Sequence, residues 1–559
     1  MRNNRLKYSI AMALGCMLFS NTAFAISDPD VRVSNDAGIQ MNRMRQYLER
    51  ERVNRQIAEE RAKAKSEVDT QGIKQTEQGD VISFELKKIV TDPSVVLTDA
   101  ELDTIIKPYE GKQVELSDIY AIVNKINALY SEKGYVTCRA FLPQQTISDG
   151  IVKLMLVEGR TGTTVINGNT HTKSKYITNR LHLQAGDVAN VKQLNKDMLL
   201  FNATNSTQLR IVMKAGALPN TTDYEITAYE PRQFGWTLME DNAGSYSSGA
   251  YRTGLFFNTA SLSGLCDSLS VGTIYSEGTK AGSAMYSRSI GRSGTKLNLL
   301  YNSNSVKTVK GTDGYDVLGH ASSYTVGIVQ PLAVTDKLRS ELSLEYNKQD
   351  SKSDFRTSGT RFNIVDDSVQ DFTLGYALTN YGDSHVLFQK HSYVFGNSDS
   401  TPVMSQANSI DYGFYKLNFL YKKLYQAGQM INVRADAQWS STKGMVSSRQ
   451  FYMGGMYSVR GYKESFIGGD SGYVLSAEYQ MPLIDKTTSC YTFFDYGHVY
   501  SNGQSADADR ILAGAGLGVR TLINNKYSAD LSVAFPLHRE FQSEKVSKAR
   551  LHFIVSAQF

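Results

Sequence analysis

Two short segments near the C-terminus contain residue types that could do chemistry. The first, Gly469-Asp470-Ser471-Gly472, has the Gly-Asp-Ser-Gly pattern found around the nucleophile of serine proteases. A catalytic serine also needs a histidine and an acidic residue in an ordered set, and the sequence shows no such set. The pattern is short and lies in a stretch rich in Gly and Ser, so we attribute it to chance and predict no enzymatic activity. A hydrolase that uses a His–Ser pair on a lipid-facing wall stays open as an alternative.

The second segment is Val459-Arg460-Gly461-Tyr462, at the centre of a Gly-rich loop that reads GGMYSVRGYKESFIGGDSGY (residues 454–473). An arginine near an aromatic residue inside such a loop is a pattern that a solvated loop does not need. The planar guanidinium of arginine binds a carboxylate through two parallel hydrogen bonds. From these residues alone, Arg460 is either solvated at a loop tip or the partner of a carboxylate that the loop folds back to meet.

Composition narrows the classes of function. The 60 Lys and Arg residues nearly balance the 55 Asp and Glu residues, so the charge does not indicate nucleic acid or an acidic substrate as a partner. The eight histidines form no H-E-x-x-H or other ligand spacing, and no G-x-x-x-x-G-K-[ST] nucleotide-binding loop occurs. We therefore predict no metal and no cofactor. With 33 Tyr, 44 Gly and only 10 Pro, the composition favours many short strands joined by tight turns.

The first 25 residues have the form of a secretory signal peptide. Arg2, Arg5 and Lys7 precede an apolar stretch, and Ala23-Phe24-Ala25 is a cleavage signal. A lipoprotein signal at Cys16 is the alternative, but it would cut inside the apolar stretch. After the signal peptide, the three remaining cysteines are scattered and indicate no disulfide, and no run of 18 apolar residues occurs. We therefore expect export across the inner membrane.

Residues 36–66 predict a helix that is polar on nearly every side. They consist of good helix formers, with a thin apolar stripe and Arg or Glu at most other positions. Such a helix does not join a core but lies in water or in a polar channel, and at 1.5 Å per residue it would be roughly 45 Å long. The alternative is a solvated charged helix that only spaces its neighbours. Residues 67–80 have no periodicity and predict a flexible linker.

Residues 81–229 predict two small α+β domains in tandem. In residues 81–159, a strand, two amphipathic helices and two further strands follow one another. Thr98 and Glu101 form a capping box at the start of the first helix, and Gly134 ends the second. Residues 160–229 repeat this order more loosely. Each domain is expected to present a sheet edge.

From residue 230 to residue 559 the helical periodicity disappears and a period of two takes its place. The last segment, ARLHFIVSAQF, has apolar side chains at Leu551, Phe553 and Val555 and polar His552 and Ser556 on the opposite face. Alternation over about ten residues is typical of transmembrane β-strands, and Tyr or Phe near the ends of the apolar face fits aromatic girdles. A soluble sandwich can alternate as well, but its strands are usually shorter.

Short and long connections alternate along this region, as periplasmic turns and extracellular loops do in bacterial barrels. Short turns such as those at 335–336 and 524–525 lie between longer polar loops such as 397–412 and 441–471. The segments between them predict sixteen strands, which would close into a barrel with a water-filled lumen. A general porin would explain the barrel but not the two domains before it.

These segments together resemble a known family, the TpsB transporters of two-partner secretion, which are relatives of the BamA-type assembly factors. The stretch KPYEGK…LVEGR (107–160) resembles the family's first POTRA domain, and VINGN (165–169) with LQAGDVANVKQLNKDMLLFN (183–202) resembles the second. The V-R-G-Y segment matches the family's motif on the sixth extracellular loop, and FFDYG (493–497) matches its F-x-D-x-G motif on the thirteenth strand. The match covers nearly the whole mature chain. The helix of residues 36–66 matches the family's plug helix in position and charge only.

The resemblance implies a membrane all-β protein of the bacterial outer membrane. Its expected fold is a 16-stranded transmembrane β-barrel preceded by an N-terminal plug helix and two periplasmic α+β POTRA domains. In the family the sixth loop folds back into the barrel, so Arg460 is expected to pair with Asp495 on the inner wall and to hold the loop there. The motif residues that the resemblance assigns are Val459, Arg460, Gly461 and Tyr462 on the loop and Phe493, Asp495 and Gly497 on the strand.

The resemblance also implies a function, the export of one large β-helical exoprotein of the TpsA type. The POTRA domains would bind the secretion domain of this partner, and the barrel would translocate it unfolded to the cell surface without ATP. Because an extended chain can add to a sheet edge through backbone hydrogen bonds, we expect a client groove between residues 192–202 and 207–216. The side chains assigned to this groove are Leu194, Met198, Leu209 and Ile211.

A BamA-type outer-membrane protein assembly factor is the alternative function. Such factors share the POTRA domains, the barrel and the V-R-G motif, but usually have more POTRA domains and lack the plug helix. We expect a monomer in contact with outer-membrane lipid. The sequence leaves open whether the partner is a haemolysin, an adhesin or a growth-inhibition toxin, where the plug rests, and which POTRA edge binds. The predicted segments are 1–25 signal peptide, 36–66 plug helix, 67–80 linker, 81–159 first POTRA domain, 160–229 second POTRA domain and 230–559 barrel.

Overall fold

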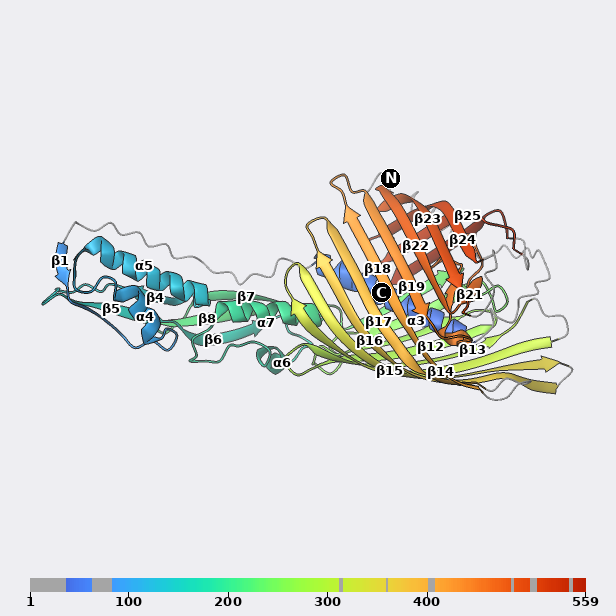
Figure 1. Cartoon of the computed structure of the whole chain (residues 1–559), viewed down its shortest axis with the longest axis horizontal. Coiled ribbons are helices and arrows are strands. Elements are labelled where there is room, and N and C mark those ends of the chain that lie inside the picture. The colour runs from blue at the N-terminus through green and yellow to red at the C-terminus, as the bar shows by residue number, and fades with distance from the viewer. Residues whose placement is uncertain are drawn as a thin grey trace.

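The protein has two parts, an elongated arm of small domains and a large β-barrel (Figure 1). The predicted signal peptide (1–25) and linker (67–80) lie outside the residues that the structure describes. The computed structural model describes residues 37–62, 83–310, 315–357, 360–400, 408–483, 487–502, 510–541 and 546–559.

The first domain of the arm packs two helices on short strands. Its capping box is present, because Glu101 N–H donates to Thr98 Oγ1 and the Glu101 carboxylate accepts from Thr98 N–H. The predicted first strand is divided into two short strands, 83–86 and 88–91, and a four-residue strand at 112–115 was missed, since so few residues show no clear period of two. Fully buried side chains such as Ile119, Ile122 and Leu154 form the core. The elements are β1 (Ser83–Leu86), β2 (Lys88–Thr91), α4 (Asp99–Ile106), β3 (Lys112–Glu115), α5 (Leu116–Lys133), β4 (Cys138–Phe141) and β5 (Ile151–Glu158).

The second domain is a three-stranded sheet covered by helices. Its elements are β6 (Arg160–Asn167), α6 (Ser174–Thr178), α7 (Val191–Thr204), β7 (Gln208–Ala215) and β8 (Thr221–Tyr229). The strands lie in the order β6-β8-β7, so β7 is an edge strand. The two domains are joined end to end, because Val191 N–H, at the start of α7, donates to the carbonyl of Gly134, directly after α5 (2.8 Å). Among the helices of the described residues, none is long and apolar enough to cross a membrane.

The barrel is closed and has sixteen strands, as predicted. Neighbouring strands are antiparallel, and β26 pairs with β9 over Ile554–Gln558 to close the ring. The strands are β9 (Phe234–Asp241), β10 (Arg252–Thr259), β11 (Ser268–Tyr275), β12 (Thr279–Ile290), β13 (Thr295–Lys307), β14 (Tyr315–Val334), β15 (Leu338–Thr357), β16 (Thr360–Tyr381), β17 (His385–Ser400), β18 (Asn408–Leu424), β19 (Met430–Ser440), β22 (Ser471–Pro482), β23 (Thr488–Tyr500), β24 (Ile511–Ile523), β25 (Tyr527–Pro536) and β26 (Arg550–Gln558).

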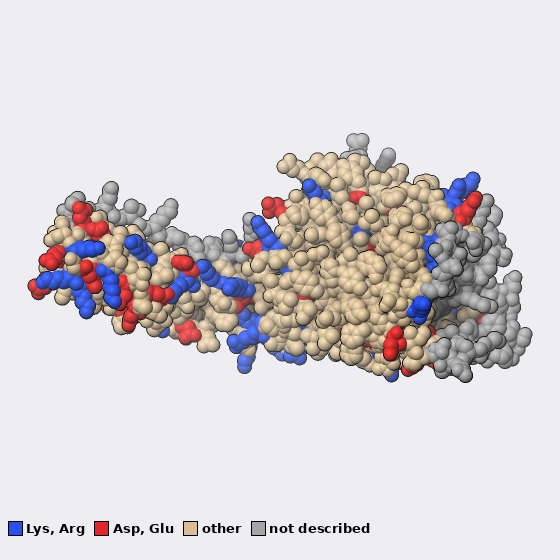
Figure 2. Space-filling view, in the orientation of Figure 1, with Lys and Arg blue, Asp and Glu red and all other residues tan. Residues whose placement is uncertain are grey.

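The predicted alternation places apolar side chains outside the barrel. Leu344 and Leu551 are exposed on the outer surface, whereas Arg339 and His552 on the same strands are buried. Charged side chains cover the arm but are sparse on the visible wall of the barrel (Figure 2). An outward apolar band with a polar interior is the pattern that a lipid bilayer selects.

A single polar helix, α3 (Ala37–Ala62), runs inside the barrel (Figure 1). Its 26 residues correspond to a length of about 39 Å at 1.5 Å per residue. Ala37 and Met41 in its first turns pack against Val306 and Ala321 on the inner wall. The structure therefore places within the lumen the helix that the sequence analysis expects as a plug.

Candidate functional site

The site is built around the loop that joins β19 to β22. Instead of extending outward, this sixth loop folds into the barrel and carries η1 (Ser447–Arg449), β20 (Phe451–Met453) and β21 (Ile467–Gly469). Val459 and Tyr462 are fully buried, so the loop centre is not a solvated tip. Gly461 has φ +100°, and a Cβ there would lie 3.0 Å from Pro536 N, so only glycine fits this close approach.

Arg460 binds Asp495 through two parallel hydrogen bonds. Its Nε lies 2.7 Å from Asp495 Oδ2, and its Nη2 lies 2.8 Å from Asp495 Oδ1. Asp495 is fully buried and also accepts from Ser476 Oγ, which stands opposite it on β22. The contact that the resemblance implied is thus present in the structure. Its role in holding the loop during export stays a prediction.

The remaining motif residues shape the pocket for this ion pair. The ring of Phe493 lies beneath the guanidinium of Arg460, 3.5 Å from its centre to Cζ. Gly497 leaves room for Met453 of the loop, because a Cβ at Gly497 would lie 2.6 Å from Met453 Sδ. The hydroxyl of Tyr462 lies 2.7 Å from the carbonyl oxygen of His538, which ties the loop to the far end of β25.

A second carboxylate at this site was missed by the sequence analysis. Glu478 Oε1 lies 2.7 Å from Arg460 Nη1, so one guanidinium bridges two acidic residues on neighbouring strands. The side chain of Glu478 points from β22 into the lumen, but no sequence motif surrounds this residue. The alternation of β22 could therefore predict an inward carboxylate without predicting its partner.

The other arm of the sixth loop has an ion pair of its own, which no motif indicated. Arg449 in η1 donates from Nη2 and Nε to Asp371 Oδ2 on β16, at 2.6 and 2.9 Å. Asp371 also accepts from Tyr412 Oη at 3.0 Å, and Arg449 Nη1 donates to Gln349 Oε1. Arg449 and Asp371 are both buried. The loop is thus bound to two separate parts of the wall.

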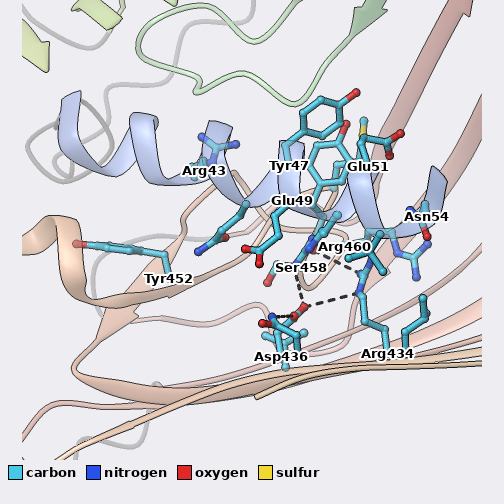
Figure 3. Close-up of a pocket in the computed structure, with 18 of the residues that line it drawn as sticks. Arg43, Tyr47, Glu49, Glu51, Asn54, Arg434, Asp436, Tyr452, Ser458 and Arg460 are labelled. Carbon is cyan, nitrogen blue, oxygen red and sulfur yellow. Dashed lines mark hydrogen bonds and ion pairs between the residues drawn. The ribbon is translucent and has the colours of Figure 1, made fainter. Parts of the chain in front are cut away.

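The helix α3 is held in the lumen mainly by ion pairs with partly exposed members. Figure 3 shows Arg43, Glu49 and Asp436 at this interface. Most members of these pairs are half-buried and Glu464 is buried, so the helix is bound to the wall by several separate polar contacts. The ion pairs seen in the described part of the helix are Arg43–Glu464 (2.5 Å), Arg45–Glu345 (3.1 Å), Glu49–Lys390 (2.6 Å) and Arg50–Asp436 (2.7 Å).

The client groove proposed for the second POTRA domain needs a correction. Leu194, Met198, Leu209 and Ile211 are buried between α7 and the sheet, with no more than 3% of each exposed. They form the domain core, because they lie on the faces of α7 and β7 that pack against each other. A client cannot reach these side chains. Among the described residues β7 pairs only with β8, so what it offers is a backbone edge.

Hydrogen bonds to neighbouring segments hold the Gly-Asp-Ser-Gly segment in place. Ser471 is buried, accepts from Ser440 N–H at 2.9 Å and donates to the Ser440 carbonyl at 3.2 Å. Asp470 Oδ2 accepts from Asn502 N–H at 2.8 Å. Across the described ranges, no group of three His, Cys, Asp or Glu residues is placed to hold a metal ion.

Glu230 ties the second POTRA domain to the start of the barrel. It accepts from Thr170 Oγ1 (2.7 Å) and from the N–H groups of His171 (2.8 Å) and Thr172 (2.6 Å). The same segment reaches the first barrel turn, where Lys173 N–H donates to the Gly264 carbonyl. Partial burial raises the pKa of Glu230, but these hydrogen bonds outweigh it and lower the pKa to about 2.

This joint is expected to loosen only in acid. Because the folded pKa of Glu230 is below its ordinary value of 4.5, the carboxylate stabilises the joint fully above about pH 4.5 and loses this effect as the pH falls toward 2. Hydrogen exchange of the His171 and Thr172 amides, compared at pH 6 and pH 3 after correction for intrinsic rates, should show lost protection. The amides of β8 serve as the internal reference. Equal protection at both pH values would contradict the assignment.

Known protein families and individual proteins match this chain over most of its length. The family model described as haemolysin secretion/activation protein ShlB/FhaC/HecB matches residues 220–521. The model of the POTRA domain of ShlB type matches residues 84–159. The heme/hemopexin transporter protein HuxB of Haemophilus influenzae is 24% identical over 572 residues, which cover 95% of this chain and 96% of that relative.

A second group of relatives carries the name CdiB. The outer membrane transporter CdiB of Escherichia coli is 21% identical over 486 residues, covering 81% of this chain and 79% of the relative. The solved structure of CdiB from Escherichia coli covers 96% of this chain and 100% of its own, with a TM-score of 0.70 at 18% identity. CdiB from Acinetobacter baumannii gives 0.67 over the same share of this chain. At these identities the structural matches establish the fold.

Proposed function

Because this chain belongs to the haemolysin secretion/activation family ShlB/FhaC/HecB, the TpsB transporters of two-partner secretion, we propose that it exports one large exoprotein. It is an outer-membrane transporter, and its POTRA domains lie in the periplasm. The proposed partner is a β-helical protein of the TpsA type, recognised in the periplasm and carried unfolded through the lumen by a monomeric barrel.

The observation that carries the proposal is a polar lumen occupied by a polar helix and by a loop that folds in from the wall. The helix α3 lies across the lumen and is held by ion pairs such as Arg50–Asp436, whose half-buried members keep some contact with water. The sixth loop, in contrast, is bound by the buried pair of Arg460 with Asp495. A fixed loop beside a removable helix suits a pore that opens for a polypeptide and then closes.

General physical arguments account for how the client is bound and for the direction of its export. An extended client can add to the free edge of β7 through backbone hydrogen bonds, which depend little on side-chain sequence. We propose that no ATP is used, and that folding of the partner outside the cell prevents its return. The relatives named for heme/hemopexin transport and the CdiB transporters support a secreted partner. Whether that partner is a haemolysin, an adhesin or a growth-inhibition toxin stays open.

Deletion of the gene tests this function. We expect one large protein to disappear from the medium or cell surface while the other outer-membrane proteins keep their normal levels. Quantitative proteomics of both fractions, with the gene restored on a plasmid as the control, measures this. A joint decrease of many barrel proteins would contradict the proposal and support an assembly factor.

A further inference from the structure

The helix α3 divides the lumen into two unequal environments. On one side, a cavity of about 630 Å³ lies between α3 and a wall formed largely by β9–β15, with further lining residues from β17 and β24–β26. Charged groups enter the lining from other strands, at Glu345, Lys390, Arg520 and Asp530. Most of the side chains that β11–β14 contribute to the lining are uncharged and polar. Examples are Ser270, Ser283, Ser287, Asn298 and Thr325. Lys296 and Arg339 lie near its periplasmic end, at the second positions of β13 and β15.

The other side of α3 faces a charged wall. A second cavity, of about 500 Å³, is lined there by Lys390, Lys416, Arg434, Asp436 and Glu478. Two of the ion pairs of α3, Arg50–Asp436 and Glu49–Lys390, are made on this side. These pairs join α3 to the charged wall, and Arg45–Glu345 joins it to β15. Much of the luminal face of β11–β14, the uncharged wall, faces open space.

The open cavity continues directly from the second POTRA domain. Asn205 and Ser206, which follow α7, line the cavity, and β7 begins two residues later at Gln208. Arg339 Nη1 donates to the Ala203 carbonyl at 2.7 Å, so the end of α7 is bound to the start of β15. Within the described chain, β7 pairs with β8 alone, which leaves its other edge free. A strand added to this edge would lead into the cavity.

The uncharged wall suits a moving polypeptide backbone. Hydroxyl and amide side chains can donate and accept, so they can meet either group of an extended backbone. Neighbours on this wall hydrogen-bond to each other, as Ser287 does with Asn298 (2.7 Å) and Thr325 with Asn347 (3.0 Å), and such bonds can exchange for bonds to a client. A charged client side chain would instead bind tightly to the opposite wall, and transport needs binding that is weak enough to release.

We propose that the exported polypeptide first enters the barrel as an extended, uncharged polar segment that lies along the β11–β14 wall while α3 is still in place. This inference rests on the proposed export function and specifies its entry route. The outer end of the route is closed at this stage, because Ala37 and Met41 pack against Val306 and Ala321. Asn304 Nδ2 also donates to the Ala37 carbonyl at 2.9 Å. Loading of the cavity therefore precedes departure of the plug.

Site-specific photo-crosslinking tests the route. The photoreactive residue p-benzoylphenylalanine is placed at Ser287 on the uncharged wall or at Asn432, which lines the cavity on the charged side. In the native host, illumination should attach to Ser287 the same protein that disappears in the deletion strain, identified by mass spectrometry. Stronger attachment at Asn432 would overturn the route. If the deletion strain loses no exoprotein, the proposed function itself fails.

A pair of charge substitutions provides a second measurement that does not need a bulky probe. Ser287→Lys is expected to lower export several-fold, because a fixed charge now stands on the entry wall. Ser287→Thr, which keeps the hydroxyl, and Asn432→Lys, which adds the same charge to the other wall, should leave export near normal. Outer-membrane levels of each variant control for folding. Equal losses in Ser287→Lys and Asn432→Lys would overturn the route.

Discussion

Asp495→Asn is expected to abolish export while the barrel still inserts into the outer membrane. The change leaves Arg460 buried with half of its bidentate partner lost, although Glu478 remains. Breaking a buried ion pair costs about 3–5 kcal/mol, which shifts the balance between docked and released loop by at least a hundredfold or so. Asparagine keeps the shape of the side chain, so the effect isolates the charge.

The measurement compares secreted partner protein with transporter level in the outer membrane. Asp530→Asn is the matched control, because Asp530 binds Arg520 on the same inner wall (2.6 Å) but is partly exposed. We expect the control to retain most export. Protease added outside the cell should cleave the loop in Asp495→Asn and spare it in the control. Normal export by Asp495→Asn at a normal membrane level would refute the role of this ion pair.

The second large effect is expected from Asp371→Asn, which releases the opposite arm of the sixth loop. Arg449 would lose its charged partner and remain buried with neutral ones, Tyr412, Gln349 and the backbone. The cost is of the same order, about 3–5 kcal/mol. Because this arm also contacts the plug, through Asn42 and the Ser448 carbonyl, its release should weaken closure of the pore.

Two readouts distinguish this variant from Asp495→Asn. Asp371→Asn should raise the steady ion conductance of the purified protein in planar bilayers and raise uptake of large antibiotics by cells. Asp350→Asn, an exposed position on β15 that contacts Ser368, is the control and should change neither. The double variant Asp371→Asn, Asp495→Asn should expose the whole loop to protease. Unchanged conductance with a folded barrel would show that Arg449 has no part in closure.

Both ion pairs hold the sixth loop, and this loop also contacts α3. Arg43 binds Glu464, which follows the V-R-G-Y motif, and Arg50 donates to the Tyr457 carbonyl just before it. Departure of α3 therefore removes contacts on both sides of Arg460 without breaking the buried pair with Asp495. Under the proposed export mechanism, the loop would thus stay attached to the wall while the lumen opens.

The sequence alone determined the barrel, its strand number and the positions of its motifs. Alternation is a local property, since each residue faces lipid or lumen according to its parity along a strand, as Leu344 and Arg339 show. Helix caps at Thr98 and Gly134 are equally local. The polar surface of residues 37–62 excluded a core position for the helix for the same reason.

Only the tertiary structure decided which residues meet across the lumen. Arg449 and Asp371 are 78 positions apart, and their contact depends on how the loop folds back and on the stagger of β16 in the closed ring. The burial of Leu194 and Ile211, which removed them from the client groove, depends on which face of α7 packs on the sheet. The open cavity beside Ser287 depends on where α3 lies across the lumen. Partner choice at long range is set by register and packing, and a local pattern carries no information about either.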